Sequence, residues 1–258
     1  MTKIAVCVIV IGEEYKKFYE RYFKGSHERY CKKYGYDLLF IDKFLDLNKE
    51  RHTKDYITFQ KVLVPSDPRL ESYEYVLMLD ADIYIIANAP PLSEIINVCG
   101  DKIGAVNEAA DPSPEIRQSI NKIKGWQVTP TEYYNSILPQ YKFETLAVIN
   151  TGFLLIQPKK HIPFFKGIYD KYADAQKDNP WEMHFEQSVV GYEMQTQDLV
   201  YYCDNRWNCI MLVHAEHPSQ YLMDPDYFFP VFLQKYSFLH FCAKQYLILA
   251  ESLQHSGL

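Results

Sequence analysis

The sequence predicts an α/β fold in which a mainly parallel central sheet is flanked by helices. Its 258 residues begin with an apolar run over residues 4–11, which Gly12 ends. Residues 13–34 then carry Tyr and Phe at helical spacing, and a second strand pattern follows over residues 36–41. A strand, a helix and a strand in this order are typical of the right-handed crossover between parallel strands. We therefore expect a parallel sheet.

The rest of the chain supplies further strands and helices. Residues 76–79 form an aliphatic run of the kind that is buried on both faces of a sheet. Residues 107–144 carry four prolines and are predicted to be a long irregular insert. Further helices are predicted at 57–64, 92–98, 162–176 and 183–195, and further strands at 83–85, 102–106, 199–202, 209–213 and 237–241. No repeat or linker interrupts this pattern, so we expect a single domain over residues 1–258.

Composition excludes several classes of protein. Hydrophobic residues make up 48% of the chain, which argues against a disordered or fibrous protein. The net charge of −6, without a basic block, argues against nucleic acid as a partner. Six cysteines show no Cys-x-x-Cys spacing, which fits a reducing compartment. The run 4–11 is too short to span a bilayer and no signal-peptide cleavage site follows it. We expect a cytoplasmic protein, in its source cell or in the host cell of a virus.

Two carboxylates, Asp80 and Asp82, follow the apolar run 76–79 directly. An Asp-x-Asp pair alone is weak evidence, because about one copy is expected by chance in a chain of this length. A solvated turn is the alternative. The buried strand before the pair changes this weighting, because the carboxyl ends of strands form the ligand crevice of an open α/β sheet. Oxygen ligands at that edge suit a hard divalent cation that can bridge phosphates.

A second informative segment lies near the end of the chain. His240 sits inside an apolar run, where a histidine with satisfied hydrogen bonds in the core is the alternative to a ligand. Lys244 follows four residues later, and its point charge is suited to a phosphate.

Three other groups of residues have both a structural and a functional interpretation. Asn150-Thr-Gly152 lies between two apolar runs and is either a bulge or turn, or the wall of a sugar pocket. Glu186-Gln187, on a predicted helix, is either a surface pair or part of a site. His214, Glu216 and His217 lack the helical spacing of a zinc enzyme, and we interpret them as a solvated loop.

Taken in order, these residues resemble a known family. Lys61, Leu79-Asp-Ala-Asp82, Asn150-Thr-Gly-Phe153, Glu186-Gln187 and His240-Phe241 with Lys244 are similar to the motifs of GT-A nucleotide-sugar glycosyltransferases. The galactosyl/xylosyltransferase-type, glycogenin-like and lipopolysaccharide-galactosyltransferase-like families are the most similar. The resemblance covers roughly residues 3–245. It implies a single Rossmann-like GT-A domain, with a nucleotide-binding half at about 1–106 and an acceptor and catalytic half at about 107–258.

The resemblance also implies a role for each matched residue. Asp80, Asp82 and His240 would bind Mn²⁺, with Mg²⁺ as the alternative, and Asp80 would also contact the donor ribose. Lys244 would hold the diphosphate, and Lys61 would lie close to the donor. The residues implied to hold the uracil are Ile11 and Tyr15, and those implied to line the donor-sugar and acceptor pocket are Asn150 and Gln187. The chain departs from the pattern in three places: Cys242-Ala243 stands where a Gly is usual, no Lys-Pro-Trp follows, and Glu186 stands where Asp is frequent.

The implied reaction moves a sugar from a nucleoside diphosphate donor, with UDP favoured, to a hydroxyl of a glycan or glycoconjugate. The resemblance favours retention of configuration, with Gln187 or Glu186 as the side chains available at the reacting carbon. Inversion would need a carboxylate base, for which Glu108, Asp111 and Glu186 are the candidates. Three alternatives remain: a haloacid-dehalogenase-type phosphatase, which also places Asp-x-Asp after a strand, a non-catalytic sugar-nucleotide binder, and a nucleotidyltransferase, whose Gly-rich N-terminal loop this chain lacks.

Overall fold

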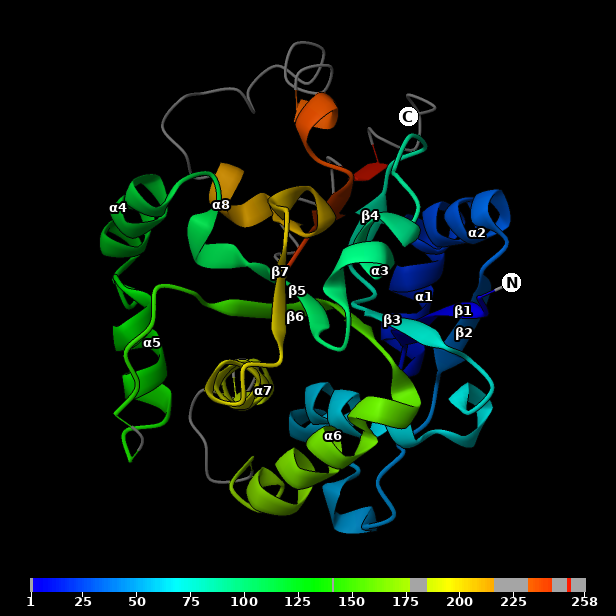
Figure 1. The fold of residues 1–258 in the computed structure, drawn as a ribbon, viewed down its shortest axis with the longest axis horizontal. Coiled ribbons are helices and arrows are strands. Elements are labelled where there is room, and N and C mark those ends of the chain that lie inside the picture. The colour runs from blue at the N-terminus through cyan, green and yellow to red at the C-terminus, as the bar shows by residue number, and fades with distance from the viewer. Residues whose placement is uncertain (1, 141, 177–184, 216–231, 243–249, 252–258) are drawn as a thin grey trace.

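A computed structural model describes residues 2–140, 142–176, 185–215, 232–242 and 250–251. Within these residues a central sheet of six strands has the order β2-β1-β3-β6-β5-β7 (Figure 1). Its strands are β1 (Ile4–Ile9), β2 (Asp37–Ile41), β3 (Tyr75–Leu79), β5 (Ile103–Asn107), β6 (Ile149–Ile156) and β7 (Val200–Cys203). β6 is antiparallel to both of its neighbours, and the other pairings in this sheet are parallel. The predicted α/β fold with a mainly parallel sheet is confirmed.

Helices cover both faces of this sheet, because its central strands are apolar on both sides. Along β1, Val6 and Val8 belong to one core cluster and Ala5 and Cys7 to the other. The first cluster is covered by α1 (Glu13–Tyr22) and α2 (Lys24–Tyr34). The second is covered by a 3-10 segment, η3 (Thr58–Ser66), and by α6 (Pro158–Tyr172) and α7 (Phe185–Thr196). α3 (Ser93–Cys99) precedes β5. Shorter 3-10 turns lie at Lys49–Arg51, Lys54–Tyr56, Pro68–Leu70, Glu108–Ala110 and Asn205–Trp207.

Two predicted elements differ from the structure in the first half of the chain. The helix expected over residues 13–34 is broken at Phe23, where the backbone leaves helical geometry at φ −122°. Phe23 is fully buried and packs on Phe241, so tertiary packing overrides the helical spacing of the aromatics. The helix expected at 57–64 is the 3-10 segment η3, which contains Pro65.

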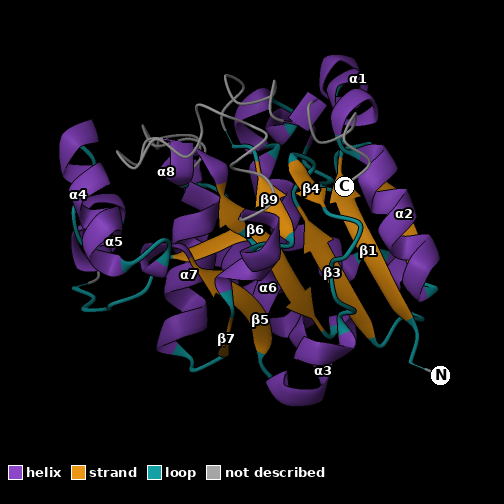
Figure 2. Cartoon of the chain, turned by 90° about the horizontal axis from the view of Figure 1, so that it is seen from above, coloured by secondary structure: helices purple, strands orange, loops and turns teal. Residues whose placement is uncertain are grey.

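The predicted irregular insert at 107–144 is wrong, because it contains two regular helices. They are α4 (Pro114–Lys124) and α5 (Pro130–Ile137), which lie next to each other on the side of the molecule away from β1 and β2 (Figures 1 and 2). The Ser113 side chain caps α4, and Thr129 with Glu132 forms a capping box at the start of α5. Both helices carry Pro in the first turn, which is a normal helix start. Two of the four prolines, Pro114 and Pro130, therefore begin helices.

A smaller three-stranded sheet packs beside the carboxyl ends of the central strands (Figure 2). Its order is β4-β9-β8, with β4 at Ile83–Ile85, β9 at Phe238–His240 and β8 at Cys209–Ile210. The strand expected at 209–213 is shorter, because α8 (Met211–Ala215) takes over after two residues. In this sheet His240 pairs with Ile83 and with Ile210. The pairing with Ile83 brings His240 next to Asp82, although the two lie 158 positions apart in the sequence.

Asn150-Thr-Gly152 lies inside β6 and forms a bulge. Val106 of β5 pairs with Asn150, but its neighbour Ala105 pairs with Leu154, so the intervening residues of β6 bulge out of the ladder.

No helix in the described ranges is both long and apolar enough to cross a membrane. The division into halves near residue 106 stays a prediction.

Candidate metal and donor site

Asp80, Asp82 and His240 converge where β3 ends and β4 begins. Their ligand atoms all lie within 4.8 Å of one another. His240 Nε2 lies 3.2 Å from Asp82 Oδ1 and 3.9 Å from Asp80 Oδ2. Two backbone contacts hold this geometry: Asp80 N donates to Gly152 O at 2.8 Å, and Phe241 N donates to Asp82 O at 2.9 Å. Strand β6 and the residue that follows β9 therefore fix the backbone at the two carboxylates.

A chain of side-chain hydrogen bonds orients the His240 ring. Nδ1 lies 3.0 Å from Asn208 Oδ1, and Asn208 Nδ2 donates to Asn150 Oδ1 at 2.6 Å. Asn150 Nδ2 donates in turn to Glu108 Oε2 at 2.7 Å, and Arg117 pairs with Glu108 Oε1 at 3.0 Å. With Nδ1 engaged, Nε2 is directed at the carboxylates. A metal-ligating histidine is normally held in this way through its second nitrogen.

The imidazole ring of His240 also packs closely against the bulge of β6. A Cβ built at Gly152 would lie 2.6 Å from His240 Cε1 and 2.8 Å from Asn150 Oδ1. Gly at position 152 is thus required by the close approach of the imidazole, which is a usual reason for Gly in a strand.

Lys61 joins the carboxylate pair to the helix α7. Its Nζ lies 2.7 Å from Asp80 Oδ1 and 3.7 Å from Glu186 Oε1, and it donates to Thr151 O at 3.0 Å. Thr151 Oγ1 donates to Glu186 Oε2 at 3.2 Å. Lys61 and Glu186 are both buried. Glu186 was interpreted as either a surface or a site residue, and its burial excludes the surface alternative.

The charges in this site shift one another's pKa values. Burial raises the pKa of Glu186 to about 7, with Lys61 acting against the shift and Asp80 adding to it. Burial disfavours the charged forms of Asp82 and His240, but their mutual attraction outweighs it, so the pKa of Asp82 falls and that of His240 rises. Burial likewise acts against the charge of Lys61, yet Asp80 and Glu186 raise its pKa. The site therefore holds an ion pair that a metal can replace by displacing the imidazole proton.

The donor set fits a hard or borderline divalent ion. Two carboxylates and one imidazole are ligands that Mn²⁺ accepts, and the structure brings one atom of each within reach of a common point. The fixed Nδ1 of His240 leaves Nε2 as the ligand atom. Mg²⁺ would be held mainly by the two carboxylates.

The other predicted donor residues are placed as follows. Ile11 is buried after β1. Tyr15 lies in the first turn of α1 and is 37% exposed, but desolvation of its hydroxyl end and the nearby Asp82 and Asp80 charges raise its pKa well above the ordinary value. Gln187, on α7, donates Nε2 to the Tyr133 hydroxyl at 3.2 Å. Lys244 lies outside the described residues.

The structure does not bring Asp111 to this site. Its carboxylate contacts His214 and Tyr236, at 2.6 Å each, in a separate cluster. The interpretation of His214 as part of a solvated loop is wrong, because it lies in α8 with a side chain that is 11% exposed. Glu216 and His217 lie outside the described residues.

Arg117 was missed by reasoning from the sequence. Thr151 and Asn208 stand in segments with both a structural and a sugar-facing interpretation, but their contacts were not predicted, because each reaches the site through a partner far away in the sequence. Asn208 borders the aromatic Trp207, and only the pairing of β8 with β9 shows that it faces His240. The capping signal before α4 was the one local clue to the placement of Arg117.

The structure was compared with solved protein structures, and the sequence with family models and curated proteins. No family model and no curated protein sequence matches the chain. A glycosyltransferase involved in glycosylation of the major capsid of PBCV-1 is 18% identical with a TM-score of 0.59, over 97% of this chain and 99% of that one. The galactosyltransferase LgtC, in complex with donor and acceptor sugar analogues, is 15% identical with a TM-score of 0.56, over 96% and 95%.

A third structure, the apo glycosyltransferase GlyE of Streptococcus pneumoniae, is 13% identical with a TM-score of 0.58, over 100% of this chain and 61% of that one. At these identities the likeness is one of fold. The resemblance found in the motifs is confirmed at this level: the chain has the GT-A glycosyltransferase fold.

Proposed function

We propose that this protein is a metal-dependent glycosyltransferase that moves a sugar from a nucleoside diphosphate donor to a hydroxyl of a glycan or glycoconjugate. One observation carries the proposal: Asp80, Asp82 and His240, far apart in the sequence, present their ligand atoms to one point at the carboxyl end of the sheet. Strand ends of this kind form the ligand crevice of open α/β folds. The GT-A fold supports the same function, whereas it gives no support to the phosphatase alternative.

Asp80, Asp82 and His240 would hold Mn²⁺, or Mg²⁺ in its place. The bound ion would neutralise the charge that develops on the leaving nucleoside diphosphate. Lys61 and the proposed diphosphate ligand Lys244 add positive charge from the protein itself. We assign UDP as the nucleotide, with its base beside Ile11 and Tyr15 at the end of β1. This assignment rests on the motif resemblance.

The sugar would lie between the carboxylates and α7, beside Asn150 and Gln187. The Gln187 amide is oriented by its bond to Tyr133. Glu186 lies behind it, paired with Lys61 and Thr151. Among the described residues the Gln187 amide is the group offered to the donor sugar, while the candidate base Glu186 is engaged by Lys61 and Thr151, and on this basis we favour retention. Asp111 is less suited to act as a base because both of its oxygens are engaged.

The proposal is tested by a donor screen. Purified protein is incubated with UDP-, GDP- and dTDP-sugars and Mn²⁺, and release of the nucleoside diphosphate is followed with and without added hydroxyl acceptors. We expect turnover of one UDP-sugar that chelation abolishes, and loss of turnover in Asp82→Ala. Hydrolysis of a generic phosphate ester without any sugar nucleotide, or full activity of Asp82→Ala, would reject the assignment. The anomeric proton of the first product, observed by NMR, decides between retention and inversion.

The compartment is part of the proposal. The six cysteines are free thiols, and five of them are buried. Buried unpaired thiols are typical of proteins that work in a reducing environment. We therefore propose a cytoplasmic location, in the source cell or in a virus host cell.

A further inference from the structure

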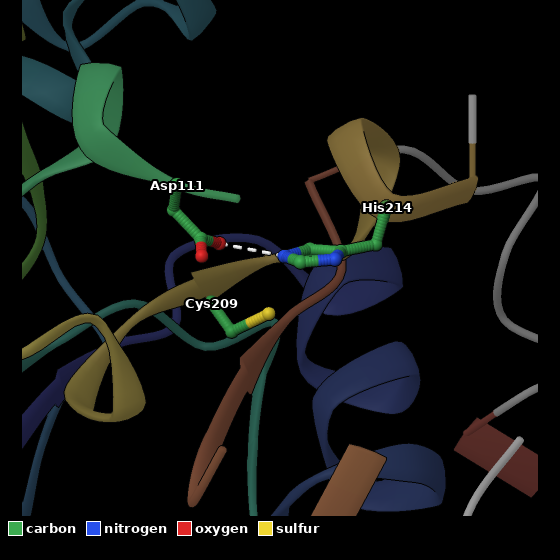
Figure 3. A group of neighbouring side chains, drawn as sticks. All are labelled: Asp111, Cys209 and His214. Atoms are coloured by element: carbon green, nitrogen blue, oxygen red, sulfur yellow. Dashed lines mark hydrogen bonds and ion pairs between the residues drawn. The ribbon is translucent and has the colours of Figure 1, made fainter. Parts of the chain in front are cut away.

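A second group of metal-ligating side chains lies apart from the donor site. Asp111, Cys209 and His214 each place a ligand atom within 4.8 Å of the other two. Figure 3 shows the three side chains converging from different segments, with the sulfur of Cys209 directed toward the imidazole. Asp111 follows the turn Glu108–Ala110, Cys209 begins β8 and His214 lies in α8. The sequence gives no local sign of this cluster, because its members come from three elements.

The contacts within this cluster leave each side chain in a position to bind a metal. Asp111 Oδ2 lies 2.6 Å from His214 Nε2, while Oδ1 accepts a hydrogen bond from the Tyr236 hydroxyl at 2.6 Å. The rings of Tyr236 and His214 also pack against each other, with centroids 4.9 Å apart. A ligating carboxylate commonly has its second oxygen fixed in this manner. Asp111 and Cys209 are 2% and 0% exposed, so bulk water does not compete for their ligand atoms.

We propose that Asp111, Cys209 and His214 bind a Zn²⁺-class ion at a site distinct from the donor site. One thiol, one imidazole and one carboxylate form a mixed set that suits Zn²⁺ and is poorly suited to Mg²⁺ or Mn²⁺. With these three ligands, taken from the described part of the chain, a fourth tetrahedral position is left for water. Bonds of about 2.0–2.3 Å place tetrahedral ligand atoms about 3.3–3.6 Å apart. The 2.6 Å contact between Asp111 and His214 would open by about 0.7 Å, and the other separations already lie within 4.8 Å.

The place of the proposed metal site in the fold indicates its role. Cys209 directly follows Asn208, which holds the Nδ1 of His240. Its neighbour Ile210 pairs with His240 in the small sheet. An ion bound to Cys209 and to α8 would therefore fix β8, and through it the imidazole of the donor site. We assign it a positioning role, since none of its ligands contacts Asp80 or Asp82.

Cobalt substitution tests this site on the full-length protein. Co²⁺ is added to the metal-free protein, and its absorption is recorded in the visible range and in the near ultraviolet, where a thiolate ligand gives a charge-transfer band. We expect the thiolate band at one Co²⁺ per chain, retained in Asp82→Asn. Cys209→Ser should lose the band, and His214→Gln should weaken Co²⁺ binding at this site at least tenfold, because losing a ligand costs no less than losing an outer hydrogen-bond partner, about 10- to 100-fold.

Two cysteine variants serve as controls. Cys203→Ser removes another buried strand thiol, and Cys242→Ser removes the thiol two residues after His240, so both should keep the band. Thermal unfolding of each variant shows that it is folded. The proposal is overturned if folded wild-type protein gives no thiolate band, if the band survives in Cys209→Ser, or if Cys242→Ser abolishes it.

Discussion

Replacing Gly152 by Ala tests whether the imidazole of His240 must sit where the structure places it. The added Cβ would lie 2.6 Å from Cε1 and 2.9 Å from Nδ1 of His240, and 2.8 Å from Asn150 Oδ1. Ordinary contact begins at 3.4 Å, so the ring must move by about 0.8 Å. The backbone cannot retreat freely, because Gly152 O accepts the hydrogen bond from Asp80 N. Overpacking of this kind costs about 1–3 kcal/mol of stability, and a catalytic group misplaced by about 1 Å costs on the order of 100-fold in rate.

The assay is Mn²⁺-dependent release of nucleoside diphosphate from the donor found in the screen, together with urea unfolding. We expect Gly152→Ala to lose on the order of 100-fold in kcat/KM and to need more Mn²⁺ for half-maximal rate. Gly167→Ala is the matched control, since a Cβ there meets nothing within 4 Å and Gly167 lies in α6. It should keep full activity and gain up to about 1 kcal/mol. Wild-type rate and Mn²⁺ dependence in Gly152→Ala would refute the proposed role of His240.

Three further predictions concern the network around the site. Lys61→Met should lower the free energy of unfolding by about 3 kcal/mol and raise the pKa of Glu186 further, because it removes the cation from a buried cluster; urea unfolding as a function of pH measures both. Burial lowers the pKa of His27 to about 4, so the unfolded chain binds more protons than the folded chain between about pH 4 and 6.5. The free energy of unfolding therefore falls as the pH falls through that window, by about 2 kcal/mol from pH 7 to 5. His27→Gln should lack this part of the pH dependence. Asn208→Ala should weaken Mn²⁺ binding about 10- to 100-fold, since the second nitrogen of His240 loses its partner; Mn²⁺ titration by calorimetry shows it.

Each of these predictions has a control and a contrary outcome. Lys16→Met, at an exposed position, should leave stability unchanged, and equal stability of Lys61→Met would contradict the buried network. An unchanged acid limb in His27→Gln would show that other groups dominate acid unfolding. Asn205→Ala, nearby in the same turn, should keep the Mn²⁺ affinity that Asn208→Ala loses.

The sequence predicts the central sheet because the hydrophobic pattern that forms it is local. Residues 4–9 and 75–79 are apolar at every position, and both strands are buried on both faces. The carboxylate pair is predictable for the same reason, since it directly follows such a strand. Helix breaks are less accessible: Phe23 continues the aromatic spacing of α1, yet its burial against Phe241 ends the helix.

The supporting residues could not be predicted because each depends on a contact between distant segments. Asn208 holds His240 only because β8 pairs with β9, and the register of two short strands is not encoded by local pattern. Cys209 and His214 meet Asp111 for the same reason. The residues around Glu186 in the sequence form an ordinary helix pattern that does not distinguish a buried position from an exposed one. Glu186 is buried only because α7 packs against β6. Long-range pairing therefore decides the site, while local pattern decides the sheet.

The hydrogen bonds from His240 to Arg117 have one consistent direction, and this direction determines how the ring can bind a metal. Asn208 donates its Nδ2 to Asn150, so its Oδ1 is the atom that faces His240 Nδ1. An oxygen there accepts a hydrogen bond, which places the ring hydrogen on Nδ1 and leaves Nε2 with a lone pair once the ring is neutral. Asn150 is oriented in the same sense because it donates to Glu108, whose charge is balanced by Arg117. Arg117 on α4 and Glu108 in the preceding turn thus select the tautomer of His240 without contacting it, which gives α4 a function at the metal site.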